Sequence, residues 1–430
     1  MADPLRSDLA HLFRRAGFGA TPEQLDAALR AGYAATVANL ISPRLPDRGA
    51  ATTPAPTFEV TPPPGRGATT TQRRTYQLQV ATEGRQLMLW WLDRMVMAEQ
   101  PFTEKMTFFW HGHFATALQK VHSSALMLRQ NQLLRSHGLG AFDALDLAVA
   151  RDPAMMIWLD TNLNVAAHPN ENFARENMEL FTLGYGRYTE NDVKETARAY
   201  TGWRYLRRTD AFVEVPRLHD SGSKTVLGHS GDFDGGDAIA ILTHSQASRQ
   251  WIPTRVWSRF ARTVTVDPVV PELAAAYGPN LDLKALFTAT FTTPAFLETK
   301  GALVKQPVEY VVGTLRALGL RANSVRYLQV LRALGQVPFD PPNVGGWPAD
   351  EGWLTTAASY ARLQFAHRVA ASADLSAVEQ TARSDRVDAL AHLLSVDSFG
   401  ANTTAALRNV ADDPVTLVTL ALCAPEYVVN

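Results

Sequence analysis

The chain contains 430 residues, of which 46% are hydrophobic and 19% are charged, which is enough for one large helical body or for two to three domains. Its 41 basic and 42 acidic residues give a net charge of -1, which excludes a global electrostatic footprint for nucleic acid or for an anionic membrane. The single cysteine, Cys423, excludes an internal disulfide framework and a multi-thiolate metal site. Any metal would therefore need His, Asp or Glu ligands.

The first residues of the sequence lack the basic start, apolar core and small-residue cleavage site of a signal peptide. The apolar run at 415–423 is much shorter than the roughly 18 residues that are needed to span a bilayer. We therefore expect a cytoplasmic protein without a membrane span.

The periodicity of the sequence predicts a mainly α protein with a large multi-helix body, a small β-hairpin insertion and a long Pro/Thr-rich loop. Five segments are expected: an N-terminal helical pair (1–41), a Pro/Thr-rich linker or insertion (42–74), a helical core with a His/Glu site (75–202), a small β/turn insertion (203–236) and a C-terminal helical region packed on the core (237–430).

The N-terminal pair follows from helical spacing over residues 7–18 and from a second helix start shortly after it. That start has Thr21 as the cap, Pro22 in the first turn and Gln24 completing a capping box. The Pro, Thr, Ala and Gly residues of 42–71 cannot bury enough apolar surface to fold alone. We expect an exposed loop there, with a mobile lid as the alternative.

Two histidines, His111 and His113, lie in a predicted helix over residues 102–118. Residues two apart on a helix point about 200° apart, so only one ring is expected to face the core. His113 shares a face with Phe109 and Met106 and is the one assigned to the apolar side. A structural buried histidine and a ligand or acid/base residue are both open interpretations of His113.

The stretch from His168 to Trp203 is far richer in acidic side chains than the rest of the chain. It predicts one helix over about 171–183 and, after a glycine turn, a second helix capped near Thr189. Glu176 and Glu179 are three apart on the first helix, so their carboxylates can converge on one ion or on one proton-transfer partner.

The residues after this stretch predict a small hairpin, a turn in which Asp237 caps the next helix, and then a long helical region. Within that region, the loop 336–348 is rich in Pro and Gly and carries Trp347, with Trp353 shortly after it. Long loops that carry aromatic residues often line binding sites, although both tryptophans can equally fill the core.

Several motifs occur in the order found in a bacterial family named domain of unknown function 1800. They are the segments 11–19, 108–114, 169–184, 188–192, 219–220 and 341–347. The chain resembles that family over nearly its whole length. The resemblance implies a family whose members are often exported and often encoded beside a sulfatase-like partner family, so a sulfatase-like partner and export together with it are expectations. It carries over no catalytic residue, and Asn177 stands where the family usually has Leu.

The leading functional hypothesis is an enzyme whose buried His/carboxylate site binds a divalent iron, manganese or zinc ion. The candidate ligands are His113, Glu176 and Glu179, completed by Asp160 or His219. Such a metal would activate water or dioxygen in a hydrolase or oxidoreductase, and Arg175 would position an anionic group of an unknown substrate.

A second hypothesis is a metal-free acid/base enzyme that acts on carbohydrate. The general acid and base would be two of the acidic residues Glu171, Glu176, Glu179 and Asp192. Trp347 or Trp353 would then stack on a sugar ring.

A third hypothesis is a non-catalytic partner or scaffold protein. In that case the acidic residues and arginines of the central stretch would form a buried ion-pair network that fixes helix packing.

Overall fold

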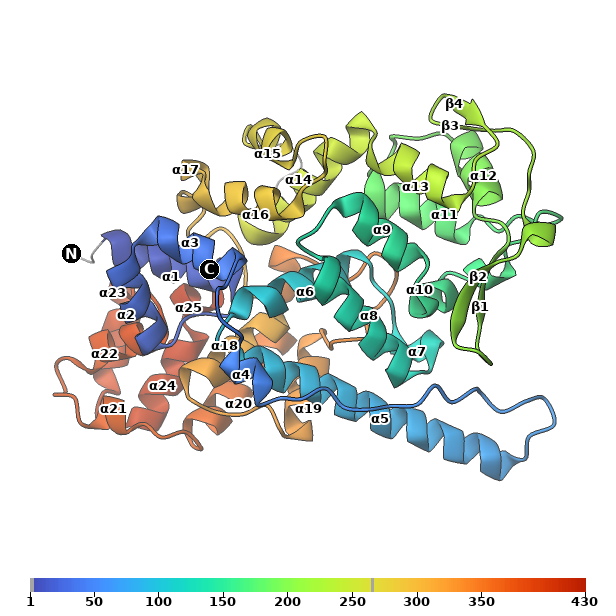
Figure 1. Cartoon of the computed structure of the whole chain (residues 1–430). Coiled ribbons are helices and arrows are strands. Elements are labelled where there is room, and N and C mark those ends of the chain that lie inside the picture. The colour runs from blue at the N-terminus through green and yellow to red at the C-terminus, as the bar shows by residue number, and fades with distance from the viewer. Residues whose placement is uncertain (1–3, 264–266) are drawn as a thin grey trace.

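The computed structural model describes residues 4–263 and 267–430 and is built mainly from α-helices (Figure 1). The described β-strands form two antiparallel two-stranded sheets. In these ranges no helix is long and apolar enough to cross a bilayer. The mainly α fold class predicted from the sequence is confirmed.

The N-terminal unit has three helices where the sequence predicts a pair: α1 (Pro4–Ala16), α2 (Pro22–Ala31) and α3 (Tyr33–Ile41). The predicted capping box is present, because Thr21 accepts from the backbone N–H of Gln24 and the Gln24 side chain accepts from the N–H of Thr21. The additional helix buries Val37 and Leu40, three apart on one face, and α3 packs against α16 (Leu283–Thr292) as well as α1 and α2.

The Pro/Thr-rich segment leads into a long helix that projects from the body. A short helix, α4 (Arg48–Ala51), is followed by a strap without regular structure, residues 52–69, and then by α5 (Thr70–Met97). Figure 1 shows the strap beside α5, whose first half extends past the other helices. The Arg73 guanidinium donates to the carbonyls of Gly65 and Arg66, at 3.2 and 2.9 Å, and so ties the strap to the helix.

The central helix of the body is α6 (Pro101–His113). Its neighbours in sequence are α7 (Leu118–Val121), α8 (Ser124–His137), α9 (Phe142–Ala150) and α10 (Pro153–Trp158). The expectation that only one of its two histidines faces the core is wrong, since His111 and His113 are 1% and 4% exposed. Other elements cover α6 on both sides: Phe339 packs on His111 and Phe181 packs on His113.

The short 3₁₀ helix η1 (Thr161–Leu163) precedes the acidic stretch, which forms α11 (Asn172–Glu176), η2 (Asn177–Thr182) and α12 (Glu190–Ala199). The element η2 is a π-helix that continues α11 directly, so the single helix expected here changes its hydrogen-bonding pattern half-way. Its last bond runs from the N–H of Leu183 to the Met178 carbonyl, five residues back, at 2.9 Å. The predicted Thr189 cap of α12 is present, and Asp192 completes its capping box.

The β/turn insertion contains two hairpins, formed by β1 (Trp203–Leu206), β2 (Ala211–Glu214), β3 (Lys224–Val226) and β4 (His229–Gly231), with η3 (Pro216–Leu218) between them. In the first hairpin Trp203 pairs with Glu214. The helix that follows is capped by Asp234, and the predicted cap, Asp237, is the third helical residue that completes the capping box. The two aspartates play reciprocal roles there, which is why their pattern alone points to either one.

The C-terminal region is helical, as expected. Its elements are α13 (Gly235–Thr243), α14 (Gln246–Phe260), α15 (Val270–Tyr277), α16 (Leu283–Thr292), α17 (Pro294–Leu297), α18 (Pro307–Ala317), α19 (Val325–Leu334), η4 (Asp350–Trp353), α20 (Thr356–Ala370), α21 (Ser376–Glu379), α22 (Arg386–Leu393), α23 (Ala401–Asn409), α24 (Pro414–Cys423) and α25 (Pro425–Val428). The loop 336–349 returns to the end of α6, where the carbonyl of Phe339 accepts from the N–H of Leu118 at 2.8 Å.

Candidate functional site

A cavity of about 740 Å³ lies where α6, α14 and the loop 336–349 meet, and we call it the α14 cavity. Its aromatic lining residues are Phe108, Phe109, Trp251 and Trp347, and its arginines are Arg255 and Arg259. His113 and Gln306 also line it. Among the described lining residues there is no Asp or Glu, so its charged groups are all basic.

Helix α14 contributes one of its faces to this cavity. Trp251, Arg255 and Arg259 follow one another at intervals of four, which places them on one side of an α-helix. The Arg255 guanidinium lies over the Trp251 ring, 5.5 Å from its centre. The indole N–H of Trp251 donates to the Leu180 carbonyl at 3.0 Å, which fixes the ring.

The loop contributes Trp347 because two glycines let it approach α6 closely. Gly346 has a φ of +83°, and a Cβ at this position would lie 2.5 Å from the carbonyl oxygen of Gly112. The Trp347 ring then packs on Phe108 and His111, with ring centres 5.9 and 5.5 Å apart. Its indole nitrogen is buried and has no hydrogen-bond partner among the described residues.

The hydrogen bonds of His113 define its tautomer. Its Nε2 lies 2.9 Å from the Phe181 carbonyl, and because a carbonyl can only accept, Nε2 carries the proton. Burial, together with the charge of Arg255, lowers the pKa of His113 to about 3, so the ring is neutral at physiological pH. Its Nδ1 is buried and unpartnered in the described part of the chain, and it presents a lone pair.

The π-helix η2 supplies the acceptors that hold both of these rings. Leu180 and Phe181 lie at its end, where helix carbonyls lack partners within the helix and are free to accept from side chains. The two consecutive carbonyls bind Trp251 and His113. The acidic stretch therefore reaches the cavity through its backbone and not through its carboxylates.

The two arginines of the cavity differ in their surroundings. Arg259 binds Glu309 at 2.5 Å, and Lys105 binds the same carboxylate at 2.5 Å. Burial alone would raise the pKa of Glu309, but Arg259 and Lys105 hold it at about 2. Arg255 is half-buried, burial lowers its pKa, and it has no ion-pair partner within residues 4–263 and 267–430. The cavity thus contains one guanidinium that is fixed and one that is available to a ligand.

The acidic residues proposed for catalysis lie outside the α14 cavity. Burial raises the pKa of Glu176, and the neighbouring charge of Glu179 adds to this effect. Glu179 also accepts from the Tyr188 hydroxyl. Arg175 binds Glu171 and Glu190, at 2.9 and 2.7 Å, close to the protein surface.

The remaining candidate metal ligands have other partners. Asp160 accepts from Lys120 at 2.8 Å, and the Nδ1 atom of His219 donates to the Thr201 carbonyl at 2.9 Å. Across the described residues no three His, Cys, Asp or Glu side chains form a group that could hold a metal ion. The side chains proposed from the sequence are therefore not gathered into one centre.

His113 and Trp347 are predicted from the sequence as site residues, whereas Trp251 and Arg255 are not. The sequence does contain a signal for them, namely one tryptophan and two arginines repeated at intervals of four in a helical segment. That signal alone cannot be told from an exposed basic face, because the residues opposite it come from α6 and from the loop 336–349.

Comparisons with known proteins extend the sequence match but name no activity. No curated protein and no solved structure matches the chain. One family model matches residues 11–429, and its description reads "protein of unknown function (DUF1800)".

Proposed function

We propose that this chain, which belongs to the DUF1800 family, binds a small organic anion with a planar ring in the α14 cavity and transfers a proton with His113 as the base. The observation that supports this most is the pairing of Arg255, which has no carboxylate partner in the described residues, with aromatic walls and a neutral imidazole in one cavity. Residues from three of the sequence segments that resemble the family, 108–114, 169–184 and 341–347, build or support this cavity.

The charge of the ligand follows from Arg255. A guanidinium binds carboxylate, phosphate and sulfate groups through paired N–H donors, and it is more weakly hydrated than an ammonium group. A half-buried guanidinium without a counter-ion lacks the favourable interaction that an anion would provide. Arg259 adds positive charge while its own position is fixed by Glu309.

The ring of the ligand follows from the walls. Trp251, Trp347, Phe108 and Phe109 offer flat apolar surfaces, and a volume of about 740 Å³ suits a small organic molecule. The indole N–H of Trp347 is buried and unpartnered, so a polar substituent of the ring would satisfy it after a small shift of the loop.

The proton transfer follows from the tautomer of His113. Its Nδ1 lone pair is buried and unpartnered, so it would accept a proton from the ligand after a small shift of the cavity wall admits the ligand, while Nε2–H stays bound to the Phe181 carbonyl. Burial is the larger cause of the low pKa of His113, and the charge of Arg255 lowers it further. An anion that neutralises Arg255 would raise the pKa of His113, so the base would become stronger when the ligand is bound.

Tryptophan fluorescence can test the binding step, because Trp251 and Trp347 line the cavity. We expect benzoate, phenyl phosphate or phenyl sulfate to change the emission in a saturable manner, and neutral benzyl alcohol to do so much more weakly. Arg255→Gln should weaken binding of the anion by about 10- to 100-fold, which corresponds to the loss of a hydrogen bond to a charged group. Arg408→Gln, at an exposed site on α23, is the matched control. Equal binding of the neutral probe, or an unchanged affinity in Arg255→Gln, would contradict the proposal.

NMR titration of the His113 ring tests the base. The free protein should show a neutral ring protonated on Nε2 between pH 5 and 9, because the pKa is lowered to about 3. Saturation with whichever of the three probe anions binds should raise this pKa. A ring protonated on Nδ1, or a pKa that does not move, would exclude His113 as the base even if the anion binds.

A further inference from the structure

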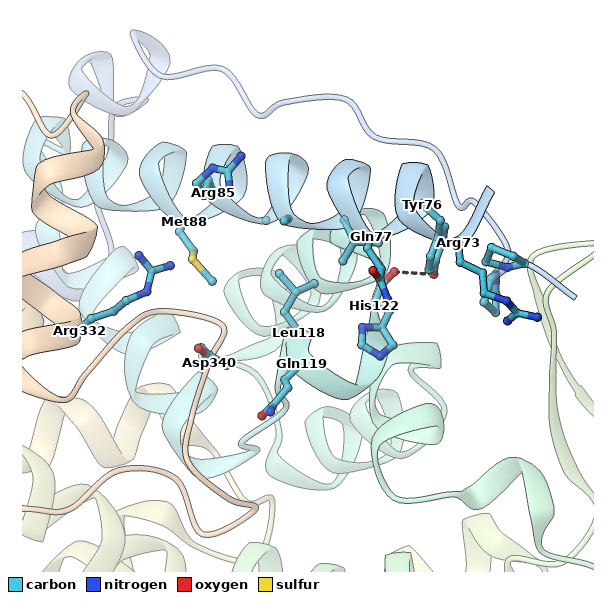
Figure 2. A pocket seen from close by; sticks show the side chains of 15 residues that line it. Arg73, Tyr76, Gln77, Arg85, Met88, Leu118, Gln119, His122, Arg332 and Asp340 are labelled. Atoms are coloured by element: carbon cyan, nitrogen blue, oxygen red, sulfur yellow. Dashed lines mark hydrogen bonds between the residues drawn. The ribbon is translucent and has the colours of Figure 1, made fainter. Parts of the chain in front are cut away.

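A second cavity, of about 690 Å³, lies between the projecting half of α5 and the body, and we call it the α5 groove (Figure 2). It shares no lining residue with the α14 cavity. In Figure 2, α5 forms one side, the short helix α7 with Leu118 faces it, and Arg332 and Asp340 lie at one end.

The residues on the face of α5 that lines the groove are mostly small or apolar. Tyr76, Val80, Gly84 and Met88 recur at intervals of four and all line the groove, so they form one stripe on the helix. At Gly84 the helix meets the body, since a Cβ there would lie 2.6 Å from Cδ2 of Leu118. Beyond this contact the Tyr76 hydroxyl donates to the His122 carbonyl at 3.2 Å, which spans the groove.

The rim of the groove is basic. Arg73, Arg85 and Arg332 line it, all three are exposed, and none forms an ion pair within the described residues. The acidic residue that lines it is Asp340, where burial raises the pKa and Arg332 only partly opposes this effect. Positive charge on the rim therefore exceeds negative charge, although the chain as a whole carries a net charge of -1.

We infer that the α5 groove docks an acidic amphipathic segment of a partner protein. Apolar side chains of that segment would cover the partly exposed Tyr76 and Val80, while its carboxylates would reach Arg85 and Arg332. Burial of the apolar stripe supplies affinity, and the opposite charges supply specificity and speed of association. This proposal goes beyond the anion-binding function and does not depend on it.

The projecting half of α5 is already held in place before any partner arrives. The strap is bound to it by Arg73, and the Gln79 side chain donates to the Thr61 hydroxyl at 3.3 Å. Leu78, on the side of α5 that faces away from the groove, is 60% exposed. Packing against the body therefore does not account for every apolar side chain in this half of the helix. A surface that is ordered beforehand loses little conformational entropy on binding.

Fluorescence anisotropy with two designed probes tests this inference. Each is a fluorescein-labelled helical peptide of about 20 residues, or about 30 Å, with leucine on one face and either glutamate or lysine on the other. We expect saturable binding of the glutamate peptide, weakening as salt is raised, and about tenfold weaker binding to the double variant Arg85→Glu, Arg332→Glu. The lysine peptide should not bind the native chain measurably.

Two further variants separate local from general effects. Val80→Asp should weaken binding, because it places a polar group in the apolar stripe and repels the glutamates of the peptide, and Arg408→Glu, a charge reversal on an exposed site of α23, should leave binding unchanged. Each variant is first compared with the native chain by thermal melting. The inference is overturned if the glutamate peptide shows no saturable binding, if both peptides bind alike, or if the double variant binds as well as the native chain. A concentration-dependent dimer that Val80→Asp abolishes would overturn it in favour of a second copy of this chain.

Discussion

Asp146 is a buried carboxylate of α9 that binds a side chain of η2. The Asn177 amide donates to both of its oxygens, at 2.9 and 3.1 Å, and the Tyr200 hydroxyl donates to the Asn177 side-chain oxygen at 2.9 Å. Burial raises the pKa of Asp146 to about 7, and the hydrogen bonds from Asn177 only partly oppose this. The polar group that Asn177 introduces into an apolar stripe is therefore satisfied by side chains from two other helices.

The raised pKa makes stability depend on pH. Between about pH 4 and pH 7 the folded state keeps a proton on Asp146 that the unfolded chain has released, so the free energy of unfolding should fall as pH rises through this window. Each pKa unit corresponds to about 1.4 kcal/mol. Asp146→Asn removes this term, and urea denaturation at pH 5 and pH 8 should show a smaller loss of stability in the variant than in the native chain.

Part of the slope should remain in that variant, because burial also raises the pKa of Asp152 to about 7. Asp388→Asn, at an exposed site on α22, serves as the control. If Asp146→Asn and the native chain lose equal stability between the two pH values, the carboxylate does not titrate in this range.

Features of the elements that depend on residues within one turn are predicted correctly from the sequence, whereas features that depend on neighbouring elements are not. The capping residues Thr21 and Thr189 were predicted because a cap is specified by residues within one turn. The π-helix is not predicted, because α11 and η2 share one apolar stripe and this stripe does not reveal where the hydrogen-bonding pattern changes. The burial of both histidines of α6 was missed for a related reason, since periodicity cannot reveal that a helix is covered on two sides.

The contact between Gly346 and Gly112 joins two elements through backbone alone. Gly346→Ala should be destabilising for two reasons: its φ of +83° disfavours a side chain, and the new Cβ would meet the Gly112 carbonyl at 2.5 Å. We expect chemical denaturation to show a loss of about 2–4 kcal/mol in the free energy of unfolding. The fluorescence of Trp347 should also change.

Gly301→Ala isolates the first of these two effects, because Gly301 has a φ of +74° and open space around it. Its expected cost is about 1–2 kcal/mol. Equal costs for the two variants would mean that the loop moves away from α6 without penalty.

Across the whole molecule, a buried charge cluster connects three helices that lie far apart in sequence. Glu309 on α18 is 4% exposed and binds both Lys105 on α6 and Arg259 on α14. The sequence-based hypothesis of a buried ion-pair network places such a network in the acidic stretch, but the buried pairs of this cluster involve other residues. The same limit applies to the α14 cavity, because residues near 110, 255 and 347 meet only through the complete fold.

Removal of the Glu309 charge should destabilise the whole molecule. Glu309→Gln leaves Lys105 and Arg259 without a counter-charge in the interior, and loss of one partner of a buried ion pair typically costs about 3–5 kcal/mol. Urea denaturation measures this loss. Asp412→Asn, which removes the partner of Arg383 in an exposed pair, should change the free energy of unfolding very little. Similar effects for the two substitutions would mean that the buried cluster contributes no more to the free energy of unfolding than an exposed ion pair does.

The two consecutive carbonyls at the end of η2 link the positions of two rings of the α14 cavity. Leu180 holds Trp251 and Phe181 holds His113, so one wall of the α14 cavity and its proton acceptor are attached to adjacent peptide groups. A shift of this turn would therefore disturb the hydrogen bonds of both rings at once.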